Sequence, residues 1–224
     1  MNESWKNKTV FEKQLKLNRL QLMSRYPPHW KELITTLSKF EINDVLELGC
    51  GVGSAAQLLK SHFPSITYRG FDYSEDAIEI AKENWGEPER FFVKDFWDLT
   101  EEDVQKYDCI LESAVLDVMT NGDEALSFLL SLQPKSVYFQ RIKFTDEPSY
   151  YETYKAYDVI ETVQYYHNYK NFIDTLHKHN YRAFPIFSPA EGLLAEDHVI
   201  VDGKSTVMPT GFFTTLNTGD NNDR

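Results

Sequence analysis

The sequence predicts an α/β fold, a doubly wound sheet whose strands are mostly parallel, from three observations. Short apolar or β-branched runs alternate with helical stretches, as in parallel βαβ sheets. The first run opens into a glycine-rich turn, and the runs that follow end in acidic residues. With 224 residues and 42% hydrophobic side chains, the chain is long enough to bury one such core.

A glycine turn follows the first expected strand, at residues 44–48. Gly49, Gly51 and Gly53 give the spacing G-x-G-x-G, with Cys50 inside it. Glycines let a backbone pass close to a ligand, and the first residues of the next helix present free N–H groups. The turn therefore predicts a loop that binds a nucleoside.

The spacing disfavours a dinucleotide. Dinucleotide sites use G-x-G-x-x-G, in which the third glycine allows close helix–strand packing below a pyrophosphate. Here Ser54 stands where the third small residue belongs, and the carboxylate of Glu47 would repel a pyrophosphate. A nicotinamide dehydrogenase is thus a disfavoured alternative that dinucleotide binding would revive.

Further strands are expected along the chain, and three of them end in acids. The expected strands lie at residues 68–72, 90–95, 107–112 and 136–142, with a helix at 74–84 that Ser74 caps. Asp72, Asp95 and Glu112 close the first three of these strands. Because ligands of parallel sheets lie at the carboxyl ends of the strands, these acids and Glu47 are expected on or beside one rim.

Residues 47–53 resemble the first motif of the class I S-adenosylmethionine-dependent methyltransferases, a Rossmann-like superfamily. The resemblance covers roughly residues 40–145. It implies a seven-stranded sheet with a C-terminal antiparallel hairpin, and S-adenosyl-L-methionine as the cofactor. The sulfonium and ammonium of that cofactor suit the carboxylate of Glu47.

The resemblance also implies a role for each residue of the cofactor site. Glu47 would lie near the methionine ammonium or order the loop, while the three glycines, with Cys50 among them, line the methionine and ribose. Asp72 would bind the ribose hydroxyls, with Tyr73 next to the adenine. Asp95 would accept a hydrogen bond from the adenine amine.

The same resemblance extends to the residues after the third and fourth expected strands. Phe96 and Trp97 would be stacking partners of the adenine. Glu112 and Ser113 would begin the segment where cofactor meets acceptor. Each of the four acids, taken alone, could equally be a solvated strand end or a helix cap. Four acids at strand ends in this order favour a cofactor site.

The net charge of −12 bears on the partners of the chain. An acidic body repels a phosphate backbone, so no nucleic-acid acceptor is expected, and residues 112–115 lack the Asn/Asp-Pro-Pro-Tyr/Phe segment of nucleic-acid amino-methyltransferases. No apolar run approaches ~18 residues, so we expect no membrane association and a cytoplasmic location.

Cys50 and Cys109 are expected to be packing residues. No metal is expected, and the acids around His198 are interpreted as a surface cluster.

Three segments are expected: an N-terminal helical cap at 1–40, a methyltransferase domain at 41–216 and a disordered tail at 217–224. The cap is basic, and its cations either form the solvated face of a helix or contact an anionic substrate. A second helix is expected near 29–39. The two helices either cover the cofactor and shape the acceptor pocket or pack structurally on the sheet.

An aromatic insertion is expected near residues 145–170. Tyr150, Tyr154 and Tyr157 would share one face of a helix and line either an acceptor pocket or a subunit interface. The oligomeric state stays open, with a homodimer among the states allowed. His167 is either a general base for an acceptor hydroxyl or a structural residue.

The last elements are interpreted as architecture. A helix is expected at 171–180, closed by Asn180. Strands are expected at 181–187 and 198–201, and these two runs would form the C-terminal hairpin.

The function expected from these features is methyl transfer from S-adenosyl-L-methionine to a small-molecule acceptor. Residues 112–116 and 138–141 also resemble, faintly, methyltransferases of surface-polysaccharide or secondary-metabolite pathways, which selects no substrate. The alternatives are a protein or peptide methyltransferase and a non-catalytic regulatory protein that binds the cofactor. The acceptor and the methylated atom stay open.

Overall fold

A computed structural model of the chain describes residues 3–187, 198–201 and 204–217. The expected tail falls outside these residues apart from Asn217, and so do Glu196, Asp197 and Asp202 of the expected surface cluster. Within the described ranges, no helix is long and apolar enough to cross a membrane.

Seven strands form the central sheet, in the order β3-β2-β1-β4-β5-β12-β9. They are β1 (Asp44–Leu48), β2 (Thr67–Asp72), β3 (Phe91–Val93), β4 (Cys109–Ser113), β5 (Ser136–Gln140), β9 (Tyr181–Ile186) and β12 (Gly211–Leu216). The first five are parallel, and β12 runs antiparallel to both β5 and β9. The predicted doubly wound sheet with an antiparallel end is confirmed.

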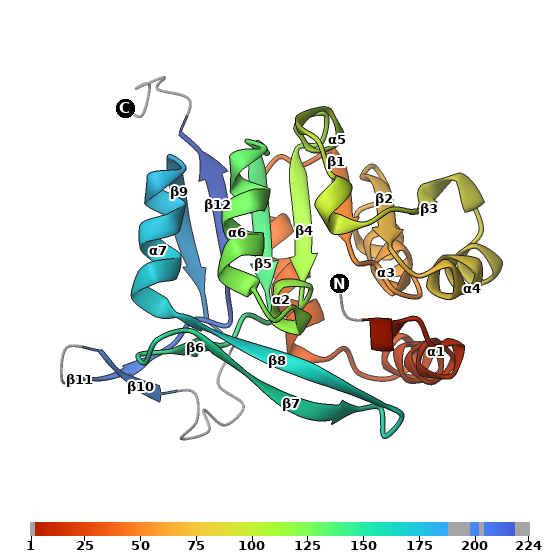
Figure 1. The fold of residues 1–224 in the computed structure, drawn as a ribbon. Helices are drawn as coiled ribbons and strands as arrows, with labels where there is room; N and C mark the ends of the chain where they lie inside the picture. The colour runs from red at the N-terminus through yellow and green to blue at the C-terminus, as the bar shows by residue number, and fades with distance from the viewer. Residues whose placement is uncertain (1–2, 188–197, 202–203, 218–224) are drawn as a thin grey trace.

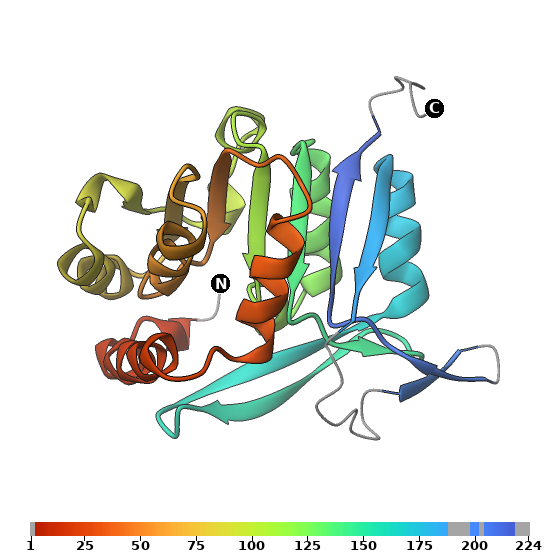
Figure 2. The same ribbon diagram turned by 180° about the vertical axis from the view of Figure 1, so that it is seen from behind.

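Helices cover both faces of this sheet (Figures 1 and 2). They are α1 (Lys8–Met23), α2 (Pro28–Leu37), α3 (Ser54–His62), α4 (Glu75–Trp85), α5 (Glu101–Gln105), α6 (Gly122–Ser131) and α7 (Tyr169–Lys178), with 3₁₀ turns at Glu3–Trp5, Pro88–Arg90, Phe96–Asp98 and Leu116–Val118. Apolar side chains of α6 and α7 form one core with one face of the sheet, and those of α2, α3 and α4 form a second core with the other face. The sheet is therefore buried on both sides, as its continuous apolar strands require.

Capping side chains fix where several helices begin and end. The Ser74 hydroxyl accepts a hydrogen bond from the backbone N–H of Ala77, as expected for the start of α4. Asn168 caps α7 in the same way. Asn180 follows α7 with a positive φ of 66°, a conformation that asparagine tolerates and that ends a helix.

The C-terminal hairpin differs from the expected one. β9 pairs with β12, whereas the expected partner, β10 (His198–Val201), pairs with β11 (Lys204–Val207) in a separate two-stranded sheet. β12 brings Phe212, Phe213 and Thr214 into the buried position between β5 and β9. Because this position demands apolar residues on both faces, the run from residue 211 to 216 takes it.

The tyrosine-rich insertion forms strands, so the expected helical face is wrong. β7 (Tyr150–Ala156) pairs antiparallel with β8 (Ile160–Asn168), and β8 also pairs with the short β6 (Phe144–Thr145). Aromatic and β-branched residues suit a pleated surface. Tyr157 and Asp158, both at positive φ, make the turn between β7 and β8. These two strands, named here the β7–β8 ribbon, lie across the carboxyl ends of the parallel strands, next to α1 (Figure 1).

Phe172 of α7 supplies a stability test. Its ring is 1% exposed and contacts the rings of Phe139 and Phe212. Phe172→Ala is expected to lower the free energy of unfolding by about 3–5 kcal/mol, because it leaves a cavity in the core. Phe184→Ala, at a side chain that is 45% exposed on β9, is the control and should cost far less. Equal losses in urea unfolding would contradict this packing.

Candidate functional site

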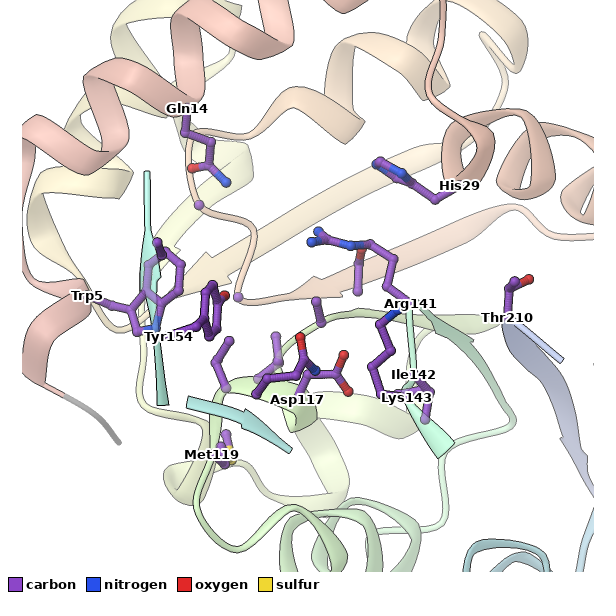
Figure 3. A pocket seen from close by; sticks show the side chains of 18 of the residues that line it. Trp5, Gln14, His29, Asp117, Met119, Arg141, Ile142, Lys143, Tyr154 and Thr210 are labelled. Carbon is purple, nitrogen blue, oxygen red and sulfur yellow. The ribbon is translucent and has the colours of Figure 1, made fainter. Parts of the chain in front are cut away.

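A cavity of about 750 Å³ lies at the carboxyl ends of the parallel strands. Its walls come from the glycine turn, from the ends of β2, β4 and β5, from α1 and α2, and from the β7–β8 ribbon. Figure 3 shows Gln14 and His29 entering from the two helices, with Arg141, Asp117 and Tyr154 in the same space. This is where ligands bind in open parallel sheets.

The glycine turn needs its glycines for two physical reasons. Gly49, Gly51 and Gly53 have φ values of 59°, 51° and 74°, in the left-handed region that side chains disfavour. A Cβ on Gly49 would lie 2.5 Å from a methyl of Val115, and a Cβ on Gly51 would lie 2.8 Å from the amide oxygen of Gln14. Gly49 and Gly51 line the cavity, so their bare backbone is open to a ligand.

Asp72 holds this turn in place. Its Oδ2 accepts a hydrogen bond of 3.0 Å from the backbone N–H of Gly51, and its Oδ1 accepts one of 2.9 Å from the N–H of Ser74. Burial raises the pKa of Asp72 to about 6. Asp72 lines the cavity, and an ionised carboxylate retains lone pairs for further hydrogen bonds. The residue that orders the turn is therefore also available to a ligand.

Glu47 is buried at the end of β1, just before the glycine turn. It does not line the cavity, and its Oε2 accepts a hydrogen bond from the Tyr68 hydroxyl. Burial raises the pKa of Glu47 to about 8, and the nearby charge of Asp72 acts in the same direction. This hydrogen bond joins β1 to β2 directly before the glycine turn.

Glu112 fixes the turn after β4. Its side chain is 0% exposed, and its Oε1 accepts hydrogen bonds from the backbone N–H groups of Val115 at 2.7 Å and Leu116 at 3.1 Å. Burial raises its pKa to about 7. Ser113, which does line the cavity, donates a 3.1 Å hydrogen bond to the side chain of Gln140. Glu112 therefore fixes the backbone of the turn, and Ser113 contacts the cavity.

The residues after β3 do not reach the cavity. Asp95 caps the following 3₁₀ turn by accepting a 2.9 Å hydrogen bond from the N–H of Trp97. Phe96 is fully buried in the core beneath α6, and Trp97 packs edge-on against it and tilted against Phe128. Stacking of Phe96 on an adenine does not fit this structure, because its ring is enclosed on all sides.

Cys50 and Gly53 also stand behind the surface that a ligand meets. Cys50 is buried, and a Cβ on Gly53 would lie 2.6 Å from the ring of Phe91. Their role is close packing of the turn against the sheet. Tyr73, in contrast, lines the cavity, with the ammonium of Lys6 5.5 Å from its ring centre.

His167 does not fit the general-base role. Its side chain is 0% exposed and does not line the cavity. Its Nδ1 is 2.7 Å from Oδ1 of Asp123, and its ring packs edge-on against Tyr165 and Phe172. An acceptor cannot touch a ring enclosed in this way, so the structural alternative describes His167.

Tyr154 and Tyr157 line the cavity, as one of the two expectations for the tyrosines had it, but the sequence reasoning missed other lining residues, including Asp117, Arg141 and Lys143. A signal existed for two of them, because Asp117 and Arg141 follow the ends of β4 and β5, on the rim where ligands bind. Arg141 itself has a positive φ of 65°, and so does Ala114, at 60°, just after β4. Non-glycine residues held in this region cluster at functional sites.

The residues present fit S-adenosyl-L-methionine. The bare backbone of Gly49 and Gly51 gives close approach, and α3 begins directly after Gly53 with no side chain capping its first N–H groups. Asp72 offers carboxylate lone pairs beside this turn, and Tyr73 offers a ring. Within the described ranges, no group of metal-ligating side chains is found.

The raised pKa of Glu47 leads to a pH prediction. A carboxyl whose pKa is about 8 when folded and 4.5 in its ordinary state stabilises the protein fully below about 4.5, and this contribution is lost as the pH rises to about 8. Glu47→Gln removes this dependence and keeps an oxygen for Tyr68. The stability of the wild type relative to the variant is therefore expected to fall between pH 5 and pH 8, by at most about 1.4 kcal/mol per pH unit.

Urea unfolding across this pH range, with Glu101→Gln at an exposed carboxyl as the control, measures the effect. Asp72 and Glu112 also have raised pKa values, but they are present in both proteins and cancel in the difference. Parallel pH profiles for the wild type and Glu47→Gln would show that Glu47 is not buried as described.

Comparison with known proteins agrees with this geometry. Residues 46–135 match a family described as a methyltransferase domain. That segment runs from β1 through β4 to the loop before β5, and it contains the glycine turn, Asp72 and the turn after β4.

Solved structures share the fold. A Listeria monocytogenes protein assigned as an S-adenosylmethionine dependent methyltransferase matches with a TM-score of 0.58 and 20% identity, over 85% of this chain and 98% of the other. DesVI of Streptomyces venezuelae matches with a TM-score of 0.55 and 11% identity, over 91% and 98% of the two chains. Magnesium protoporphyrin IX methyltransferase (ChlM) of Synechocystis PCC 6803, solved with bound SAM, matches with a TM-score of 0.53 and 15% identity, over 92% and 84%.

The family match includes the glycine turn and the ends of β2 and β4, which form part of the cavity wall. The seven-stranded sheet with its antiparallel end is the architecture that the resemblance implied. Residues 46–135 therefore form a methyltransferase domain, and the chain has the fold of solved S-adenosylmethionine-dependent methyltransferases.

Proposed function

We propose that the protein is an enzyme that transfers the methyl group of S-adenosyl-L-methionine to a small-molecule acceptor. One observation carries the proposal: a single cavity joins the glycine turn to a second group of side chains. Side chains of α1 and of the β7–β8 ribbon, two elements named here the roof, line it as well. The loop end of the cavity is defined by Gly49, Gly51, Asp72 and Tyr73. The acceptor end is defined by Asp117, Arg141, Lys143 and Tyr154.

The size of the cavity supports this acceptor class. About 750 Å³ falls within the range of about 300–1,000 Å³ that is typical of small-molecule and cofactor sites. Since the cofactor and the acceptor must share this space, the volume suits an acceptor that is a small molecule or a single side chain of a larger one.

Two hydrogen bonds join the N-terminal segment to the β7–β8 ribbon. The indole N–H of Trp5 donates a 2.9 Å hydrogen bond to the hydroxyl of Thr162 on β8, and the ammonium of Lys13 on α1 donates one of 2.9 Å to the backbone carbonyl of Tyr157. Val10 of α1 is buried against Ala156 and Ile160 of the β7–β8 ribbon. Because these contacts hold α1 and the ribbon together over the cavity, we expect a compact acceptor rather than a polymer that must pass through the site.

The bound cofactor supplies a methyl group on a sulfonium, which reacts by in-line displacement. The residues of the chain then have to hold the two reactants in line and exclude water. We assign binding of the ribose hydroxyls to Asp72 and contact with the adenine to Tyr73. The acceptor end orients the incoming nucleophile.

The other partner classes are less well supported. The charge of −12 opposes a nucleic-acid acceptor, as it would repel a phosphate backbone. A protein or peptide acceptor would have to extend one side chain beneath the roof. The ChlM protein that shares this fold is named for a small-molecule acceptor, but at 15% identity the likeness extends only to the fold, so the cavity carries the proposal.

Transfer of a labelled methyl group tests the acceptor class. The wild type is incubated with methyl-labelled S-adenosylmethionine and, separately, with pooled small hydroxy and amino compounds, with a peptide library and with RNA. We expect label only in the small-molecule pool. Gly51→Val is the inactive control, because its side chain would enter the space of Gln14 and strain the turn. Label in the peptides alone would contradict the proposal and support the protein methyltransferase alternative.

Tyr154 provides a test within the acceptor end. Tyr154→Ala is expected to raise the KM for the acceptor up to about tenfold, the worth of a lost aromatic contact, and to leave S-adenosylhomocysteine affinity unchanged. Tyr151→Ala is the matched control, since Tyr151 is the neighbouring exposed tyrosine of β7 and does not line the cavity. The assignment of Tyr154 to the acceptor end is wrong if both variants leave the KM unchanged.

A further inference from the structure

The acceptor end contains one buried carboxyl oxygen without a partner. Asp117 is 3% exposed, lies in the 3₁₀ turn after β4 and lines the cavity. Its Oδ1 has no hydrogen-bond partner among the described residues. A buried acceptor oxygen that is left unpaired costs free energy, so such atoms in a cavity usually meet a ligand or an ordered molecule.

The same end contains a cation that pairs with nothing in the described part of the chain. Arg141 follows β5, lines the cavity and remains exposed, and its guanidinium forms no hydrogen bond or ion pair there. Lys143, two residues on, also lines the cavity. In a chain of net charge −12, two cations on one cavity wall mark a place for an anion.

Arg141 and Asp117 share the cavity without pairing with each other. Their charges interact, because Arg141 and Lys143 both lower the pKa of Asp117 while burial and Glu112 raise it, with burial the largest cause. Yet no ion pair joins the Arg141 guanidinium to the Asp117 carboxyl (Figure 3). A guanidinium and a carboxyl held apart in one cavity suit a ligand that carries complementary groups at both ends.

The neighbouring residues narrow the chemistry of the ligand. Burial, and to a lesser degree the charge of Arg141, lower the pKa of His29 to about 4, so that imidazole is neutral and adds no positive charge. The carboxyls of Asp117 and Glu112 lie nearby and oppose a dianion. A guanidinium with one ammonium beside it therefore matches a carboxylate better than a phosphate.

We propose, as a refinement that rests on the proposed function, that the acceptor is a small carboxylic acid bearing a separate hydroxyl or amine. Arg141 binds its carboxylate, and Asp117 accepts the hydrogen bond of the hydroxyl or amine that becomes methylated. As the lone pair of the nucleophile forms the new bond to the methyl carbon, the C–S bond breaks and its electron pair stays on sulfur, giving the thioether. The proton of the nucleophile passes to the Asp117 carboxylate and then to solvent.

Matched acceptor pairs test the carboxylate anchor. A panel of hydroxy acids and amino acids is compared with the primary amides of the same compounds, with labelled S-adenosylmethionine. For the wild type, kcat/KM is expected to be about 10- to 100-fold higher for the acids, the worth of a hydrogen bond to a charged group. Arg141→Gln should remove this preference, and Arg141→Lys should restore part of it.

A binding measurement separates this assignment from a role in holding the cofactor. S-adenosylhomocysteine also carries a carboxylate and an ammonium, so calorimetry is used to measure its affinity for the wild type, Arg141→Gln and Asp117→Asn. Both variants are expected to bind it as the wild type does while their kcat with the acids falls. Lys39→Gln, at an exposed cation outside the cavity, controls for the change in net charge.

Four results would overturn the inference, and they differ from one another. Equal kcat/KM for acids and amides contradicts binding of the acceptor carboxylate by Arg141 but leaves the proposed function intact. A loss of S-adenosylhomocysteine affinity in Arg141→Gln assigns the guanidinium to the cofactor. Products that release labelled methanol in base are methyl esters, which makes the carboxylate the nucleophile. No transfer to any acid or amide, by a protein that binds S-adenosylhomocysteine, contradicts the proposed function itself and the inference with it.

Discussion

The two hydrogen bonds accepted by the Asp72 carboxylate are the contacts on which the site depends. They join the glycine turn after β1 to the end of β2 and to the start of α4. The turn needs such an anchor, because its three glycines adopt left-handed conformations and give it no side chain of its own to pack. With the turn fixed, its bare backbone forms one wall of the cavity, and α1 can lie directly over Gly51 through Gln14.

Burial of acids at the ends of parallel strands is the second constraint. Glu47, Asp72, Glu112 and Asp117 all lie at or just after the carboxyl ends of β1, β2 and β4, and burial raises the pKa of each of them. Glu47 and Glu112 each use one carboxyl oxygen for the scaffold, Oε2 of Glu47 in a bond from Tyr68 and Oε1 of Glu112 in bonds from two backbone N–H groups. Asp72 and Asp117 face the cavity. A site with this many carboxyls favours the positive charges of a sulfonium cofactor over a pyrophosphate.

The sequence predicted the parallel half of the fold because each strand there is a short apolar run followed by a helix or turn signal, as for β1 and the Ser74 cap of α4. It predicted the glycine turn because glycine adopts these φ values without the strain that a side chain brings. The predicted partner of β9 was wrong. Residues 211–216 form the buried strand between β5 and β9, and this position is known only from the assembled sheet. The sequence could not decide the roles of Phe96 and His167, because aromatic and imidazole side chains serve a core as readily as a site, and the sequence does not show which way they face; the structure buries both.

The measurement that tests the central claim most directly is thermal unfolding with S-adenosylmethionine, S-adenosylhomocysteine, NAD or buffer alone, for the wild type and for Asp72→Asn. A ligand present at 100 times its dissociation constant adds about 2.7 kcal/mol of stability, which a melting curve resolves. The account predicts that the two sulfur nucleosides raise the melting temperature of the wild type, that NAD does not, and that Asp72→Asn loses most of the shift while Asp98→Asn, at an exposed acid, keeps it. Stabilisation by NAD alone, or an undiminished shift in Asp72→Asn, would contradict the claim that the Asp72-anchored turn binds this cofactor.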